Sequence, residues 1–121
     1  MSNNKQQTAV DFVPYELALE LKQLGFDEPC LGVYFNPTQE LFIGKKVNEY
    51  TEDVRTPAPT YSQSFRFFRE KFNYHHTINL NKKYVGIAYS SVVNFSIDEF
   101  DTYEEAELEC IKKLIEIVKN K

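Results

Sequence analysis

The sequence predicts a single α+β domain in the order α-β-β-α-β-β-α, with a mainly antiparallel sheet from two hairpins packed by three helices. Three helix-start signatures divide the chain: Pro14–Glu16, Thr60–Gln63 and Thr102–Glu105. The last two have the form of a capping box, in which a Thr hydroxyl accepts from a backbone N–H and Gln or Glu reaches back. The stretches between these signatures are typical of strands. A length of 121 residues suits one domain.

The first helix is expected from about Pro14 to Leu24. Pro14 supplies the backbone angle favoured in a first helical turn, where its missing N–H costs little. Leucines at 17, 21 and 24 recur at helical spacing and predict the buried stripe. Gly25 is well placed as the left-handed residue that follows the helix. Residues 1–10 are predicted to form a flexible polar tail, and residues 11–121 the domain.

Two hairpins are predicted from short β-rich runs that flank turn-forming residues. Their strands are expected at Leu31–Phe35, Glu40–Gly44, Tyr74–Leu80 and Tyr84–Tyr89. Residues 92–97 fit either a further strand or an extended return, and the pattern does not decide between them. The segment Lys45–Pro59 is predicted to be irregular, because it is polar and ends in two closely spaced prolines.

The second helix is expected from about Tyr61 to Phe72. Its aromatic residues at 61, 65, 68 and 72 share one arc at ~100° per residue and are predicted to face the core. Phe67 departs from that arc by roughly 120°. An aromatic side chain in such a position is a typical interface anchor, so Phe67 is predicted to contact a partner.

The last helix, expected from about Tyr103 to Lys119, has an unusually wide apolar face. Ala106, Cys110, Leu114 and Ile117 form one stripe, which is sufficient to cover a sheet. A second stripe consists of Leu108, Ile111 and Ile115. This stripe requires another packing surface, which is either the first helix or a partner molecule. We expect a homo-oligomer that associates through this stripe.

Composition and charge exclude several classes of protein. The formal net charge is -4, which argues against direct DNA binding, since that depends on clustered basic residues. Apolar runs fall short of the ~20 residues of a membrane span. Residues 1–8 are polar and do not resemble a signal peptide. The two cysteines, Cys30 and Cys110, stand in apolar contexts and are expected to be reduced, which fits a cytoplasmic protein.

No residue pattern indicates catalysis or a metal site. His75 and His76 are adjacent in a predicted strand, so their side chains point to opposite faces and do not share a metal. Neither cysteine has a base placed beside it in the pattern. The acids that precede and open the last helix are explained as a solvated helix start. We therefore expect a protein that is not an enzyme and that has neither a cofactor nor a metal.

A ligand site is predicted around the start of the second helix. A helix N-terminus attracts anions, Tyr61 can stack on a flat ring, and Arg66 and Arg69 can form paired hydrogen bonds with phosphate. Arg55 and the Lys45-Lys46 pair lie in the preceding segment and could close over a nucleotide-like molecule. In the alternative interpretation Tyr61 belongs to the core and the arginines pair with neighbouring acids at the surface.

Several segments resemble a family of small proteins encoded by bacteriophages, prophages and their hosts, chiefly in the Bacteroidota. They are Phe12–Leu19, Leu24–Cys30, Ala58–Gln63 with Phe68–Lys71, and Thr102–Leu108. The resemblance implies an accessory protein of a mobile element, and some classes of such proteins counter host defence. We expect a non-catalytic binding protein that sequesters a nucleotide-like immune signal or occupies a host protein. The alternatives are a small enzyme acting on a nucleotide or nucleic acid, and a purely structural interaction module.

Overall fold

The structure is a computed structural model that describes residues 11–44 and 54–120. Its helices and strands are, in order, α1 (Tyr15–Gln23), β1 (Gly32–Phe35), β2 (Glu40–Ile43), β3 (Arg55–Ala58), α2 (Tyr61–Phe72), β4 (His75–Asn81), β5 (Lys83–Tyr89), β6 (Asn94–Phe100) and α3 (Tyr103–Lys119). The predicted α+β class, the three helices and the two hairpins are confirmed. The predicted tail at 1–10 and the Lys45-Lys46 pair lie outside the described residues.

Each predicted hairpin gains a third strand, so the domain contains two antiparallel sheets rather than one. Their strand orders are β2-β1-β3 and β4-β5-β6. The open question at 92–97 is settled by β6, which pairs with β5. The prediction of an irregular segment up to Pro59 was wrong at β3, where Arg55–Ala58 pairs with β1. The sequence did not predict this strand because Pro57 lacks an N–H donor. An edge strand tolerates the loss of this donor.

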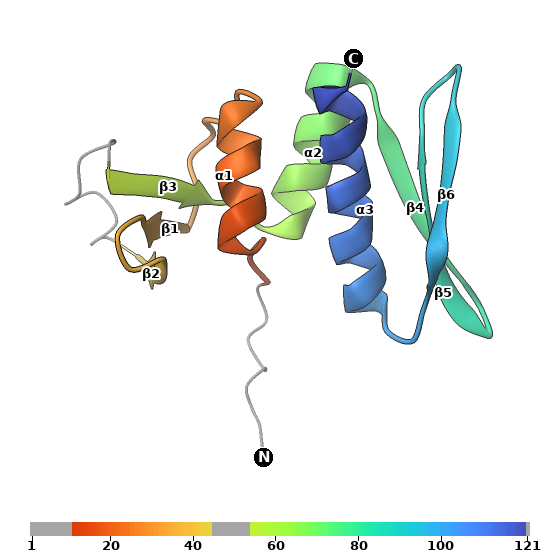
Figure 1. Ribbon diagram of the computed structural model, residues 1–121, viewed down its shortest axis with the longest axis horizontal. Helices are drawn as coiled ribbons and strands as arrows, with labels where there is room; N and C mark the ends of the chain where they lie inside the picture. Colours follow the sequence, from red (N-terminus) through yellow and green to blue (C-terminus); the bar gives the residue numbers. More distant parts are fainter. Residues whose placement is uncertain (1–10, 45–53, 121) are drawn as a thin grey trace.

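The elements are arranged in layers around α3 (Figure 1). One side of α3 contacts β4, β5 and β6, and its other side contacts α1 and α2. The β2-β1-β3 sheet packs against the far side of α1. The main core joins the three helices to the β4-β5-β6 sheet. A smaller core, centred on Ala18, Tyr34 and Ala58, lies between α1 and the other sheet.

The helix ends follow the signals in the sequence. Thr60 and Thr102 form complete capping boxes with Gln63 and Glu105. After α1, Gly25 has a φ of +106°. The Gly25 N–H donates to the carbonyl of Lys22, and the N–H of Phe26 donates to that of Leu21, each at 3.0 Å. This is the Schellman pattern, and it turns the chain into the connector at residues 24–31, which runs from α1 to β1.

Candidate functional site

The second helix holds this connector through two polar side chains one turn apart. The guanidinium Nη2 of Arg66 lies 3.0 Å from the Oε1 atom of Glu28. The amide Nε2 of Gln63 donates to the carbonyl of Pro29, also at 3.0 Å. Gln63 therefore both caps α2 and binds the connector. Arg66 has the role given by the alternative interpretation, which is an ion pair with an acid at the surface.

Tyr61 lies on another side of α2, among acidic groups. It is half-buried, and this burial raises the pKa of its hydroxyl to about 12. The carboxylates of Glu107 and Asp11 act in the same direction. Glu107 itself has a pKa raised to about 7, first by burial and then by Asp11 and Glu104. The acidic side chains around Tyr61 make this place unfavourable for a phosphate group.

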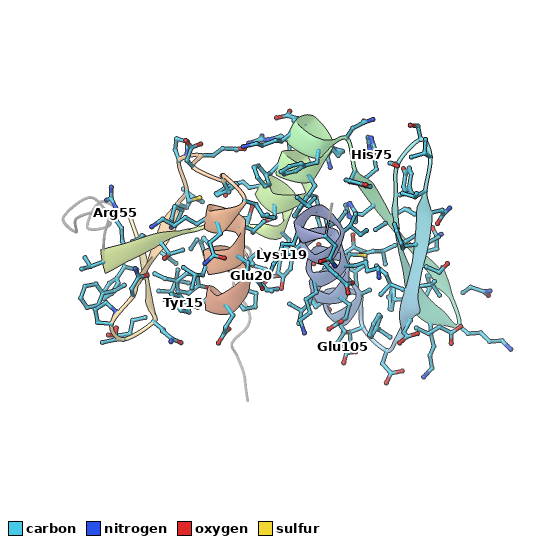
Figure 2. The ribbon with its side chains drawn as sticks, turned by 45° about the horizontal axis from the view of Figure 1, so that its top comes forward. Tyr15, Glu20, Arg55, His75, Glu105 and Lys119 are labelled. Atoms are coloured by element: carbon cyan, nitrogen blue, oxygen red, sulfur yellow. The ribbon has the colours of Figure 1, made fainter. Side chains whose placement is uncertain are left out.

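The two other predicted ligand residues lie elsewhere. Arg69 is close to His76 of β4, whose pKa it helps to lower. Arg55 begins β3, on the far side of α1 from α2 (Figure 2). Its carbonyl accepts a hydrogen bond from Lys22 Nζ at 3.0 Å. The structure therefore does not bring Tyr61, Arg55, Arg66 and Arg69 together around one ligand.

Phe67 is not an exposed anchor, which corrects the prediction made from the helical arc. Its side chain is only 4% exposed. Its ring makes edge-to-face contacts with Phe26 of the connector and with Phe72, at centroid distances of 5.4 and 5.5 Å. The connector covers this side of α2, so the helix is buried on two sides and not on one.

The second stripe of α3 is also covered within the chain. Ile111 is 0% exposed and Ile115 is 2% exposed, and Leu108 packs against the main core. The covering elements are α1 and α2, which contact α3 opposite the sheet. The predicted oligomer through Leu108, Ile111 and Ile115 therefore loses its basis. The other explanation given by the sequence, packing against the first helix, is the one that the structure supports.

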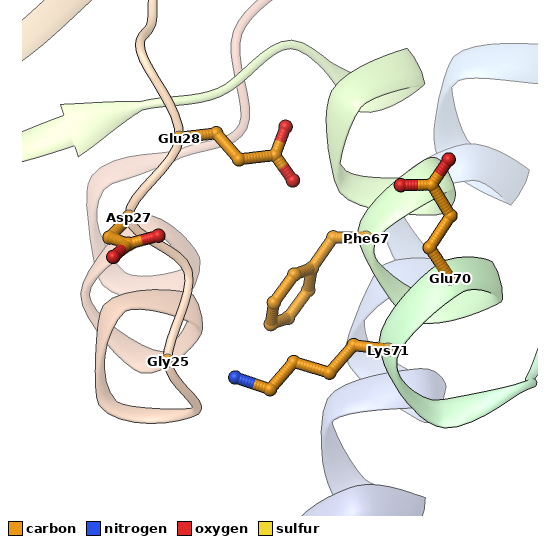
Figure 3. Close-up of a pocket in the computed structure, with 6 residues that line it drawn as sticks. All are labelled: Gly25, Asp27, Glu28, Phe67, Glu70 and Lys71. Carbon is orange, nitrogen blue, oxygen red and sulfur yellow. The ribbon is translucent and has the colours of Figure 1, made fainter.

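An open pocket of about 230 Å³ lies between the connector and α2. It is lined by Gly25, Asp27, Glu28, Phe67, Glu70 and Lys71. Figure 3 shows Glu28 extending from the connector toward α2, Asp27 close to the connector backbone, Glu70 and Lys71 on α2, and the ring of Phe67 between the connector and α2. The pocket thus combines three carboxylates, one ammonium group and an aromatic ring.

Lys71 occupies part of this pocket with its own positive charge. Its Nζ atom lies 5.7 Å from the centroid of the Phe67 ring and 5.9 Å from that of Phe72. A Cβ atom built on Gly25 would lie 2.5 Å from the same Nζ. The positive φ is what requires glycine here, since the flexible end of the lysine side chain could move away from a Cβ atom. A cation above an aromatic face is a favourable arrangement.

A second pocket, of about 330 Å³, lies between α1 and α3 and is lined by Leu17, Glu20, Lys112, Ile115, Glu116, Lys119 and Asn120. Its acids and bases balance each other. Lys119 Nζ lies 2.8 Å from Glu20 Oε1, which ties the end of α3 to α1. With no excess of either charge and no aromatic ring, this pocket is the weaker candidate for recognition.

The described residues were compared with the requirements of a metal site and of a reactive thiol. Among them, no group of three or more His, Cys, Asp or Glu side chains is placed to hold a metal ion. Cys30 and Cys110 are both free thiols. Burial is the main cause that raises the pKa of each thiol to about 11, so both are protonated at neutral pH. Residues 11–44 and 54–120 contain no helix that is long and apolar enough to cross a membrane.

The carboxylates of the connector pocket were missed by sequence reasoning. Asp27, Glu28 and Glu70 were not among the predicted ligand residues. One feature of the sequence indicated a charged site on this side of α2, because Lys71 lies on the same flank of the helix as Phe67. The pairing of that flank with the connector is not local, since Glu28 and Arg66 are 38 residues apart in the chain.

Comparisons of the chain with protein-family models, with curated proteins and with solved structures found no match.

Proposed function

We propose that the protein is a non-catalytic binding protein whose connector pocket receives a positively charged side chain of a protein partner. The observation that carries this proposal is the combination in one pocket of three carboxylates, of which Glu28 is also paired with Arg66, with the ring of Phe67. Carboxylates and aromatic faces both attract ammonium and guanidinium groups. Lys71 supports the same preference, because this cation of the chain itself already lies over the Phe67 ring.

The resemblance to small accessory proteins of phages and prophages supports a host protein as the partner. In this proposal the protein acts in the cytoplasm of the host cell and occupies a component of host defence. A nucleotide-like signal is less favoured. Arg66 is paired with Glu28 and Arg55 lies in β3, and the carboxylates that line the pocket repel phosphate.

The proposal can be tested by amide NMR with N-acetyl-arginine N-methylamide as the probe. The uncharged isostere N-acetyl-citrulline N-methylamide is the control ligand. We expect the arginine compound to shift the amide signals of residues 25–28 and 67–71, and the citrulline compound to leave them in place. Equal shifts with both compounds, or shifts elsewhere only, would contradict the proposal. Shifts with adenosine monophosphate near Arg66 or Arg69 would favour the nucleotide alternative.

Two variants give opposite expectations in the same titration. Asp27→Asn combined with Glu70→Gln removes two pocket carboxylates and should weaken binding of the arginine compound. Lys71→Met removes the competing cation and should strengthen it. Asp98→Asn combined with Glu99→Gln makes the same change of net charge on β6 and should leave the affinity unaltered. If this control weakens binding as much as the pocket variant, the attraction is due to overall charge and not to the pocket.

A further inference from the structure

The β4-β5-β6 sheet ends in two strands that differ in how their edges are protected. Both β4 and β6 have seven residues, and within the described part of the chain each pairs with β5 on one side only. Such edges expose backbone donors and acceptors to any further strand. Charged residues are a common protection against this pairing, and β6 carries Asp98 and Glu99.

Strand β4 has no such protection. Its sequence, HHTINLN, contains neither an acid, a lysine, an arginine, a proline nor a glycine. The pKa of His76 is lowered to about 4, mainly by burial, so this imidazole is neutral at pH 7. Its last three residues, Asn79–Asn81, are exposed, and Leu80 is 65% exposed although it is apolar. This edge therefore carries no acid, lysine or arginine along its length, and its outer half is exposed.

The register of the sheet shows which side chains of β4 share a face. His76 and Ile78 are opposite Ala88 and Gly86 and face α3 and the core. Thr77 and Asn79 alternate with them and so lie on the other face of the sheet. Figure 1 shows no helix on that other face. Their polar groups match as donor and acceptor, since Thr77 Oγ1 lies 3.5 Å from Asn79 Oδ1 within the strand.

We propose that two copies of the chain pair through β4, antiparallel and centred on Ile78, to form a continuous six-stranded sheet. The occupant is a second copy because the strand complements itself. In this register Thr77 of one copy is opposite Asn79 of the other, and no charges oppose each other. The exposed Leu80 of each copy is then opposite His76 of the other, on the core-facing side of the sheet. By contrast, self-pairing of β6 would gather four carboxylates at one seam.

The proposal is tested by native mass spectrometry and sedimentation of the full chain over a range of concentrations. Wild type should form a dimer. Thr77→Lys combined with Asn79→Lys should give a folded monomer, because lysines would be directly opposite lysines across the seam. The matched control is Asn94→Lys combined with Ser96→Lys, on the outer face of β6, which should remain a dimer. Circular dichroism checks that each variant is folded.

A charge-swap experiment separates a specific seam from general destabilisation. Thr77→Glu combined with Asn79→Glu should also give a monomer. Mixing this variant with the lysine variant should restore a dimer that contains one copy of each, recognised by its mass. A monomeric wild type, a dimer that survives the lysine substitutions, or a failure of the mixture to associate would each overturn the proposal. If the lysine pair prevents folding, Asn79→Lys alone, at an exposed position, brings the two lysines to diagonal positions across the seam and should weaken the dimer.

This inference does not depend on the connector pocket, because none of the residues that line the pocket belongs to the β4-β5-β6 sheet. A dimer that binds no cationic side chain would leave the inference standing and would contradict the proposed function. Binding of a cationic side chain by a strictly monomeric protein would support the proposed function and contradict this inference.

Discussion

The imidazole ring of His76 lies flat on the phenyl ring of Phe65, with the two centroids 3.4 Å apart and the planes inclined by 8°. This stack joins β4 to α2. It also removes the imidazole from water, and burial is the main reason why the pKa of His76 falls from 6.5 to about 4. The nearby positive charge of Arg69 acts in the same direction.

Stability should therefore fall in acid through His76. A histidine whose folded pKa is lower than its unfolded pKa binds its proton more readily in the unfolded chain, so protonation favours unfolding. The loss begins below pH 6.5 and is complete below about pH 4. His76→Phe should flatten this part of the profile in urea unfolding, while His75→Phe should keep it. If both variants show the wild-type acid limb, other groups cause it.

Glu107 should lower the stability as the pH rises, whereas His76 lowers it as the pH falls. Its folded pKa is raised from 4.5 to about 7, so the protonated form is favoured by folding, and stability declines as the pH rises through this window. Glu107→Gln should remove the decline and raise the free energy of unfolding at pH 8 relative to wild type. Glu105→Gln is unsuitable as a control because Glu105 caps α3. Glu116→Gln, exposed near the other end of the helix, is the better control.

Phe67 should behave as a core residue in spite of its position off the helical arc. Phe67→Ala and Phe65→Ala should each lower the free energy of unfolding by ~3–5 kcal/mol, as expected for truncation of buried aromatic residues. Chemical denaturation of the two variants is the measurement. A much smaller loss at Phe67 would mean that Phe26 and the connector do not cover it as the structure shows.

Gly86 and Cys110 should be energetically coupled. A Cβ atom on Gly86 would lie 2.7 Å from the Cys110 sulfur, because α3 packs closely over β5 at this point. Gly86→Ala should destabilise the protein by ~1–3 kcal/mol through overpacking. In a Cys110→Ala background the same substitution should cost clearly less, which a double-mutant cycle measures. If the free-energy changes of the two substitutions simply add, the clash is relieved in another way.

The sequence by itself determined the elements that depend on local interactions. The capping boxes at Thr60 and Thr102 and the left-handed Gly25 involve residues at most a few positions apart, and all are found as expected. The hairpins are local in the same sense, since their strands are joined by short turns. Such signals act before any tertiary packing forms, so they can be read directly along the chain.

Tertiary structure decided which helix faces are covered and which side chains meet. Phe67 and Ile111 are buried because the connector and α1 pack on sides of α2 and α3 that the helical period alone leaves open. The same packing pairs Arg66 with Glu28 of the connector. These contacts join residues far apart in the chain. Their free energy depends on the shape of both surfaces, which no short stretch of sequence contains.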